Sequence, residues 1–512
     1  MDFELEEAPI AELQERMTRG ELSSAGIAEA YLDRIGLLDQ SGPQVRSVIE
    51  VNPDALDIAA ARDRERASGR VRGLLHGVPI LVKDNIDTGD RMMTTAGSLA
   101  LVGHRAAEDA PVVRKLRDAG AVVLGKLNMS EWANFRSPHS TSGWSARGGQ
   151  CRNPFALDRT PWGSSSGSGA AASANFAAAT IGTETDGSIV LPAAACGVVG
   201  IKPTVGLTSR RGVIPVSTSQ DSVGPLGRTV ADAAAVLSAI AGGDGAPAEA
   251  ERDYTRSLNP DALKGARLGV PREIYFGYSE KADAVIEEAI GVLRELGAVV
   301  IDPADIPTAR HLTFLGTELT VLLYETKAGI DEYLAGVEPD APVHSLADVI
   351  AFNEEHADEE LAFFGQEFLE LARAKGPLSE TEYVEALARN RKLAREDGID
   401  AVMERYRLDA LVMPTTGPAW KIDLVVGDHV QGMGSSPAAQ AGYPLVTVPA
   451  GYAHGLPIGL LFTGRAYSEP TLIGLAYAFE QATRHRRAPR FEQLSLEERE
   501  AALGHRREVS RR

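Results

Sequence analysis

Apolar and polar positions along the chain follow two periods, and together they predict an α/β protein. In residues 10–67 apolar side chains recur at helical spacing, with a short strand expected at residues 45–51. Residues 77–86 predict a turn and a buried strand, residues 109–120 a capped helix, and residues 121–124 a further strand. This alternation of helix and strand favours a parallel or mixed sheet.

The alternation returns in the second half of the chain. We expect helices at residues 229–241, 281–296 and 471–483, and strands at residues 266–271, 298–301, 408–413, 445–450 and 458–462. Residues 314–407 have a largely helical pattern, and the acidic run at residues 353–360 predicts a solvated helix face. Because the last strands would rejoin the first sheet, the pattern favours one body over separate domains.

The composition is typical of a turn-rich globular enzyme. Apolar residues make up 44% and charged residues 24% of the chain, which excludes a disordered or fibrous protein. The formal net charge of -19 disfavours a nucleic-acid-binding face, so we expect small neutral or cationic molecules as partners. Cys151 and Cys196 have no spacing typical of a zinc or redox site, so neither a disulfide framework nor a metal is expected.

The sequence shows no targeting signal that would change this interpretation. The first residues are acidic and lack an apolar run after basic ones. The alanine-rich run after Gly169 is broken by Ser173 and Asn175, so it does not reach membrane-spanning length. We therefore expect a cytoplasmic protein that makes no membrane contact.

A stretch rich in serine and glycine, residues 161–192, is the strongest candidate for chemistry. It contains two hydroxyl-rich turns, separated by the apolar residues 170–181. A flexible linker would not carry such a segment, so we expect a packed helix and strand between the turns. Serine and glycine supply compact nucleophiles and exposed N–H donors, which an acyl-transfer site needs.

Two arrangements of catalytic residues are open at this point. In the first, the G-x-S-x-G pattern around Ser165 forms the nucleophile elbow of an esterase, which requires a histidine further along the chain, such as His429, His454 or His485. In the second, Lys83 lies at the end of its apolar strand and works with the serine turns. Its amine either reaches solvent at a sheet edge or is buried, in which case desolvation lowers its pKa and makes it a general base.

Several sequence blocks together resemble the amidase signature family. They are Gly77-Val-Pro-Ile-Leu-Val-Lys-Asp-Asn-Ile-Asp87, Gly163-Ser-Ser-Ser-Gly-Ser168, Gly182-Thr-Glu-Thr-Asp-Gly-Ser-Ile189, Gly200-Ile-Lys-Pro-Thr204 and Gln220-Asp-Ser-Val-Gly-Pro225. The loops at residues 130–136 and 142–150 resemble the peptide amidase branch in particular. Residues 245–400 are little constrained by the resemblance.

The resemblance implies a fold and a set of catalytic residues. The fold is a large twisted mixed sheet covered by helices on both faces, forming one catalytic body over residues 1–512. Its core spans about residues 70–245 and 408–485, with a helical cover at about 305–407. Lys83 becomes the base, Ser164 the bridging serine after a cis peptide bond, and Ser188 the nucleophile. Backbone N–H groups of Thr185, Asp186, Gly187 and Ser188 would form the oxyanion hole, and neither a cofactor nor a metal is required.

Two positions depart from the wider family, which commonly has glycine at Asp186 and arginine at Val190. Asp186 either orients a substrate amide or is a satisfied turn residue. Trp132, Phe135 and Trp144 either line a substrate cleft or pack under the long loop that carries them.

The expected activity is hydrolysis of a primary carboxamide through an acyl-enzyme, with release of ammonia. C-terminally amidated peptides or amino-acid amides are the favoured substrates of a monomer or homodimer that binds no nucleic acid. Two alternatives remain: one component of a tRNA-dependent amidotransferase in the same family, and a serine esterase that uses Ser165.

Overall fold

The predicted strands join into one mixed sheet of 11 strands in this computed structural model, which describes residues 3–492 apart from 244, 248–249, 251 and 313. The strand order is β1-β3-β2-β6-β8-β7-β12-β13-β11-β9-β10, and a separate ribbon consists of β4 and β5. The strands are β1 (Val48–Val51), β2 (Pro79–Lys83), β3 (Val122–Leu127), β4 (Trp144–Ser145), β5 (Gly149–Gln150), β6 (Ala179–Glu184), β7 (Val199–Lys202), β8 (Ser222–Gly227), β9 (Arg267–Gly269), β10 (Val299–Ile301), β11 (Ala410–Pro414), β12 (Leu445–Ala453) and β13 (Leu456–Thr463).

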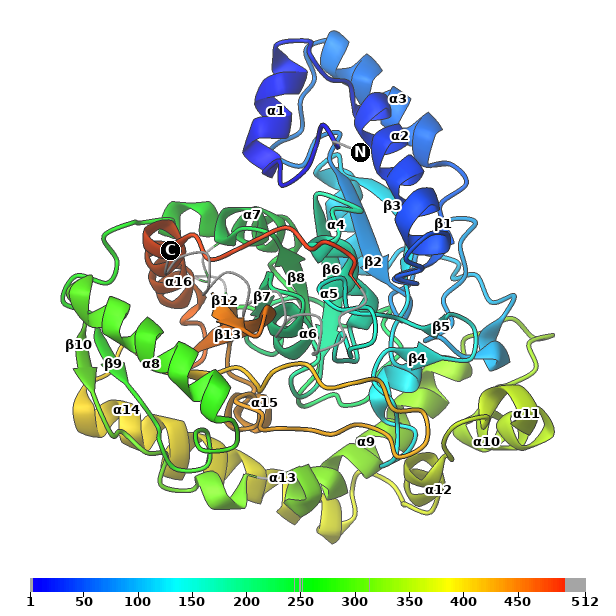
Figure 1. The fold of residues 1–512 in the computed structure, drawn as a ribbon. Coiled ribbons are helices and arrows are strands. Elements are labelled where there is room, and N and C mark those ends of the chain that lie inside the picture. Colours follow the sequence, from blue (N-terminus) through cyan, green and yellow to red (C-terminus); the bar gives the residue numbers. More distant parts are fainter. Residues whose placement is uncertain (1–2, 244, 248–249, 251, 313, 493–512) are drawn as a thin grey trace, which may run out of the picture.

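Helices surround this sheet (Figure 1). They are α1 (Ile10–Thr18), α2 (Ser24–Arg34), α3 (Ala55–Ala67), α4 (Pro111–Asp118), α5 (Ser166–Ser173), α6 (Val190–Ala195), α7 (Val230–Ile240), α8 (Glu280–Glu295), α9 (Leu319–Leu334), α10 (Leu346–Glu355), α11 (Ala357–Glu360), α12 (Glu367–Arg373), α13 (Thr381–Ala394), α14 (Asp400–Tyr406), α15 (Ser436–Ala441) and α16 (Glu469–Thr483). Among the shorter turns, η3 (Glu131–Asn134) and η6 (Phe314–Glu318) lie beside the site described below.

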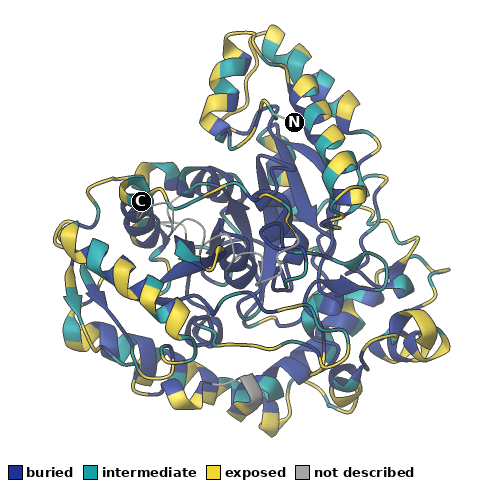
Figure 2. Ribbon diagram, in the orientation of Figure 1, coloured by how far each residue is buried: buried dark blue, intermediate teal, exposed yellow. Residues whose placement is uncertain are grey.

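Both faces of the sheet are buried, as alternate side chains of one strand show. In β11, Ala410 and Val412 belong to the largest hydrophobic cluster, whereas Leu411 and Met413 belong to a second one. Successive side chains of a strand point to opposite faces, so the two clusters lie on opposite sides of the sheet. The outer helices expose only their outward faces (Figure 2). The expected large mixed sheet with helical layers is confirmed.

The central strands place polar residues at one edge. Strand β2 runs parallel to both β3 and β6, with Val82 opposite Ile181. The carboxyl ends of β2 and β6 therefore meet, and Lys83 comes to lie beside Thr183. The turn at residues 161–165 leads into α5, and the turn at residues 185–189 leads from β6 into α6. The packed helix and strand expected between the two turns are α5 and β6.

The prediction of a solvated helix face at residues 353–360 is wrong in part. Glu354 and Glu355 are exposed, but Asn353 and Glu360 are fully buried. Glu360 accepts a hydrogen bond from the backbone N–H of Leu99 and forms an ion pair with Arg136 across 224 sequence positions. Such long-range partners leave no periodic trace in the sequence, so charge alone suggested a surface position.

Candidate active site

Lys83 is buried at the carboxyl end of β2 and is directed at a serine. Its Nζ donates to Ser164 Oγ at 2.7 Å, to Thr183 Oγ1 at 2.8 Å and to the Thr183 carbonyl at 3.2 Å. The residue is 0% exposed, so the alternative in which its amine reaches solvent is wrong. Lys83 therefore provides a buried amine that donates hydrogen bonds to two hydroxyl groups.

Burial also sets the protonation of this amine. It lowers the pKa of Lys83 to about 7, and the carboxylates of Asp221 and Glu184, which favour the ammonium, oppose this only in part. A lysine with a pKa near neutrality holds an uncharged amine in a large fraction of molecules at pH 7. Such an amine can accept a proton.

The backbone fixes the Ser164 turn in place. The Gly163–Ser164 peptide bond is cis, as expected, and the Ser164 carbonyl accepts from the N–H of Ser130 at 3.0 Å. A Cβ on Gly163 would collide with Ser130 Oγ, so only glycine fits there. The turn is thus positioned by the loop at residues 130–136.

Ser165 has a different environment from Ser164. Its Oγ donates to the Thr183 carbonyl at 2.9 Å and accepts from the Thr183 N–H at 3.2 Å. The side chain is 0% exposed and does not line a cleft. Ser165 therefore connects its turn to β6, which is not the exposed position that a nucleophile elbow provides.

Ser188 lies in the second turn, between β6 and α6. Its carbonyl accepts from the Ser165 N–H at 3.1 Å, so the two turns are joined through their backbones. Gly187 has φ +80, and a Cβ there would collide with Leu191 Cδ1. Among the described residues, none accepts a hydrogen bond from the N–H groups of Thr185, Asp186, Gly187 or Ser188, the four expected to form the oxyanion hole. They are free to bind an anionic oxygen.

Two buried carboxylates hold this second turn in shape. Glu184 Oε2 accepts from the N–H groups of Ile189 at 2.6 Å and Val190 at 2.9 Å, at the start of α6. Asp221 accepts from Thr185 Oγ1 at 2.5 Å. Burial raises the pKa of both carboxyls, and the hydrogen bonds that they accept oppose this shift. Hydrogen bonds to Glu184 and Asp221 therefore fix both ends of the turn that carries Ser188.

Asp186 is a satisfied turn residue. Its carboxylate accepts from Ser435 Oγ at 2.5 Å and from Ser436 Oγ at 2.7 Å. Burial raises its pKa, and these two hydroxyl groups oppose the shift. Behind it, burial and the neighbouring Asp186 charge raise the pKa of Glu318 well above its usual range.

A cleft of about 390 Å³ opens onto Ser188 and Gly163. Its larger apolar wall residues come from seven separate parts of the chain, including α9 and α12 of the helical cover. They are Phe135, Trp162, Leu191, Val216, Leu322, Phe368, Val430 and Met433. The cleft is suited to an apolar ligand with a few polar groups.

Only one of the three predicted aromatic contacts lies on this cleft. Phe135 lines it and stacks on Phe368, with ring centroids 5.2 Å apart. Trp132 is buried in a neighbouring cluster, and Trp144 packs edge-on against Phe364. Trp132 and Trp144 do not line the cleft, so we assign them to packing under the loop.

Thr183 and Asp221 are site residues that the sequence did not single out, whereas Asn85 directly follows the Lys83 strand, at the strand end where a polar pocket is expected. Asn85 Nδ2 donates to Thr183 Oγ1 at 3.1 Å, so Thr183 connects Lys83 with Asn85. Thr183 lies inside the Gly182–Ile189 block. It is a polar residue at the end of a buried strand, β6, which is parallel to β2, and this position could have identified it as a site residue. Asp221 is brought close to Lys83 and Thr185 only by the tertiary fold.

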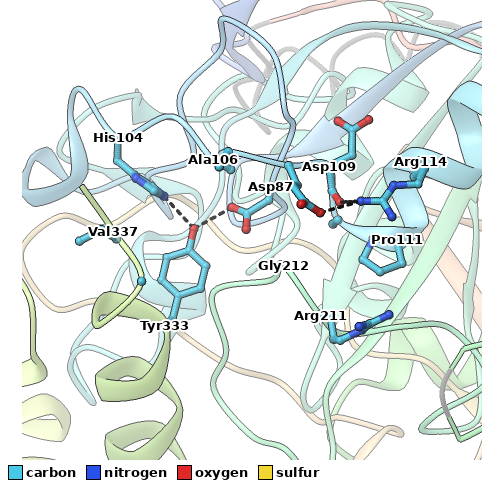
Figure 3. Close-up of a pocket in the computed structure, with 14 residues that line it drawn as sticks. Asp87, His104, Ala106, Asp109, Pro111, Arg114, Arg211, Gly212, Tyr333 and Val337 are labelled. Carbon is cyan, nitrogen blue, oxygen red and sulfur yellow. Dashed lines mark hydrogen bonds and ion pairs between the residues drawn. The ribbon is translucent and has the colours of Figure 1, made fainter. Parts of the chain in front are cut away.

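A second cavity, of about 490 Å³, shares no lining residue with the cleft. Figure 3 shows Tyr333 there, between His104 and Asp87. Its hydroxyl donates to Asp87 Oδ1 at 2.7 Å and contacts His104 Nε2 at 3.1 Å, while His104 Nδ1 contacts Glu338 at 2.7 Å. The side chains of Asp87, Tyr333, His104 and Glu338 therefore form hydrogen bonds with one another.

Searches of the described residues for two further kinds of site gave negative results. They contain no group of three or more His, Cys, Asp or Glu side chains arranged to hold a metal ion. Within the same part of the chain, every helix is too short or too polar to cross a membrane.

Comparison with known proteins shows which proteins the chain is similar to. A family model described as Amidase matches residues 26–473. The chain is 44% identical over 504 residues to a probable amidase of Arabidopsis thaliana, covering 96% of this chain and 92% of the relative. It is 37% identical to a glutamyl-tRNA(Gln) amidotransferase component of Moorella thermoacetica, with 93% and 97% covered. The crystal structure of the native peptide amidase from Stenotrophomonas maltophilia superposes with a TM-score of 0.91 at 54% identity, covering 96% of this chain and 100% of that one.

Proposed function

The chain belongs to the amidase family, and from that premise we propose that it hydrolyses primary carboxamides with Lys83, Ser164 and Ser188. The observation that carries this proposal is the hydrogen bond of 2.7 Å from a fully buried lysine to Ser164 Oγ. Because burial lowers the pKa of Lys83 to about 7, the amine can serve as a base near neutral pH.

In the proposed mechanism, neutral Lys83 takes the proton of Ser164 while Ser164 takes that of Ser188. The Ser188 oxygen attacks the carboxamide carbon, and the negative charge on the carbonyl oxygen is stabilised by the backbone N–H groups of residues 185–188. The proton then returns from Lys83 through Ser164 to the amide nitrogen, so that ammonia leaves and an acyl-enzyme remains. A water molecule then attacks the acyl carbon and gives a proton through Ser164 to Lys83. The bond to the Ser188 oxygen breaks, the proton returns from Lys83 through Ser164 to that oxygen, and the acid leaves.

We further propose amidated peptides or amino-acid amides as substrates. The apolar walls of the cleft fit the side chain of a residue that carries the carboxamide. Similarity to a peptide amidase, at 54% identity over nearly the whole chain, supports the same substrate class.

A panel of amides tests this proposal. Purified protein is incubated with N-acetylphenylalaninamide, phenylalaninamide and a tripeptide amide, and ammonia and acid products are measured. We expect turnover of at least one member, and a loss of about a thousandfold or more in Ser188→Ala. The matched control Ser165→Ala should stay within about tenfold of wild type, because Ser165 contributes only local hydrogen bonds. The reverse pattern would support the esterase alternative, and turnover of no amide would remove the substrate claim.

An amidotransferase role is the second candidate, since the Moorella amidotransferase component is 37% identical. A protein of that kind would depend on partner chains and tRNA. Ammonia release from free amides by the isolated chain supports a stand-alone hydrolase. Release that requires partner chains would support the amidotransferase.

A further inference from the structure

The charged side chains on the wall of the cleft are both acidic. Among the described residues that line the cleft, Asp186 and Asp428 are the only acidic ones, and none is a lysine, an arginine or a histidine. Both side chains are partly exposed. A wall that carries charge of one sign attracts ligands of the opposite sign and repels ligands of the same sign. The cleft should therefore distinguish ligands by charge as well as by shape.

The two carboxylates differ in their surroundings. Burial raises the pKa of Asp186, and the charge of the buried Lys202 is among the influences that oppose this shift. Asp428 is held by neutral groups instead: its Oδ1 accepts from the Ser142 N–H at 2.9 Å, and its Oδ2 accepts from Ser142 Oγ at 2.5 Å. Among the described residues, no cation forms an ion pair with Asp428. Hydrogen bonds from neutral donors favour a carboxylate without cancelling its charge.

Asp428 lies close to the turn that carries Ser164. Ser142 Oγ, which donates to Asp428, would be 3.1 Å from a Cβ placed on Gly163. One serine side chain thus connects this carboxylate with the residue before Ser164. Burial raises the pKa of Asp428 to about 6, and the hydrogen bonds from Ser142 oppose the rise. The carboxylate is therefore mostly ionised at about pH 7.

We propose that Asp428 is a specificity-determining residue, whose negative charge makes the protein prefer amide substrates that carry a positive charge near the carboxamide. The ammonium or guanidinium group of a basic side chain supplies this charge, and so does the α-ammonium of a short peptide amide. A substrate with an acidic side chain is repelled. This inference rests on the proposed function, because it names the substrate class of the same site.

The wild-type protein tests the inference with peptide amides that differ in charge. Ammonia release at about pH 7 is measured for N-acetyl-lysyl-phenylalaninamide and for its norleucyl and glutamyl counterparts. We expect kcat/KM to be about tenfold higher for the lysyl than for the glutamyl compound, with the neutral norleucyl compound between them.

A second comparison separates the two sources of positive charge. Norleucyl-phenylalaninamide carries an α-ammonium, which its N-acetyl form lacks. An advantage for the lysyl side chain or for the free α-ammonium supports the inference and identifies the source. Equal kcat/KM values in both comparisons, or a preference for the glutamyl compound, would overturn the inference and leave the proposed function standing. Ammonia release from none of these compounds would overturn both.

Two variants then locate the effect. Asp428→Asn removes the charge but keeps the shape and an oxygen that accepts from the Ser142 N–H, so the preference for the charged substrate should fall to about one. Asp423→Asn makes the same change in charge on the same segment of chain. Asp423 does not line the cleft and pairs with His429 at 3.0 Å, so this variant should preserve the wild-type preference. An unchanged preference in Asp428→Asn, or its loss in Asp423→Asn, would contradict the role of Asp428.

Discussion

At the scale of single residues, the proposed mechanism depends on an amine that is uncharged near neutral pH. Lys83 is surrounded by hydroxyl and carbonyl groups, and burial rather than a neighbouring cation lowers its pKa. Asp221 is the carboxylate that most favours the ammonium form. The activity of this base should therefore follow the charges around it in a defined direction.

The pH dependence of kcat/KM is the first prediction at this scale. Because only neutral Lys83 accepts a proton, kcat/KM should rise with pH and level off, with an apparent pKa near 7. Ammonia release from N-acetylphenylalaninamide, measured from about pH 5 to about pH 9, checks this. Asp221→Asn removes a charge that favours the ammonium, so this limb should move to lower pH. A profile without this limb, or an Asp221→Asn limb at higher pH, would argue against Lys83 as the base.

At the scale of elements, a buried cluster of three charged residues joins the loop at residues 130–136 to the helical cover. Arg136, Glu131 and Glu360 are all 0% exposed in their side chains, and Arg136 contacts both carboxylates. The Arg136 carbonyl accepts from the Phe368 N–H at 3.0 Å, at the start of α12. Arg136 thus connects the loop at residues 130–136 with α12, which contributes Phe368 to the cleft wall beside Phe135.

Replacing Arg136 by methionine should reduce stability strongly. The two carboxylates would remain buried without a cation, which lowers the free energy of unfolding by about 3 to 5 kcal/mol. Burial already raises the pKa of Glu131 well above its usual range, so this carboxyl takes up a proton when the pH falls. The deficit should therefore be larger at pH 8 than at pH 5.5, which urea unfolding at both values measures.

A surface arginine provides the control for this variant. Arg310 is 72% exposed and pairs with Glu273, so Arg310→Met should change the free energy of unfolding by less than about 1 kcal/mol. Equal effects of the two substitutions would show that the Arg136 cluster adds no more than a surface pair.

The elements themselves were largely predictable, because periodicity reports local structure. The predicted helix at residues 229–241 is α7, and the predicted strands at residues 408–413, 445–450 and 458–462 are β11, β12 and β13. The contact of Lys83 with Ser164 followed from the resemblance. The cleft walls did not follow, since Leu322 and Phe368 lie in a region that the resemblance leaves unconstrained, and no local pattern places them beside Phe135.

At the scale of the whole molecule, the site exists only because distant segments meet. Lys83 comes from β2, Ser164 from the turn before α5 and Ser188 from the turn after β6, while the helical cover closes one side of the cleft. The single mixed sheet keeps the ends of β2 and β6 together, and the cover shapes the space above them. Hydrolysis is thus proposed as a property of this assembly rather than of the serine-rich stretch alone.

Mapping the reactive serine shows directly whether Ser188 is the nucleophile. The protein is treated with a sulfonyl fluoride, digested and mapped by mass spectrometry, with and without a peptide amide that competes for the cleft. The proposed mechanism predicts modification at Ser188, protection by the amide and much slower labelling in Lys83→Met, which lacks the base. Labelling of Ser165, or labelling of Ser188 that does not depend on Lys83, would contradict it.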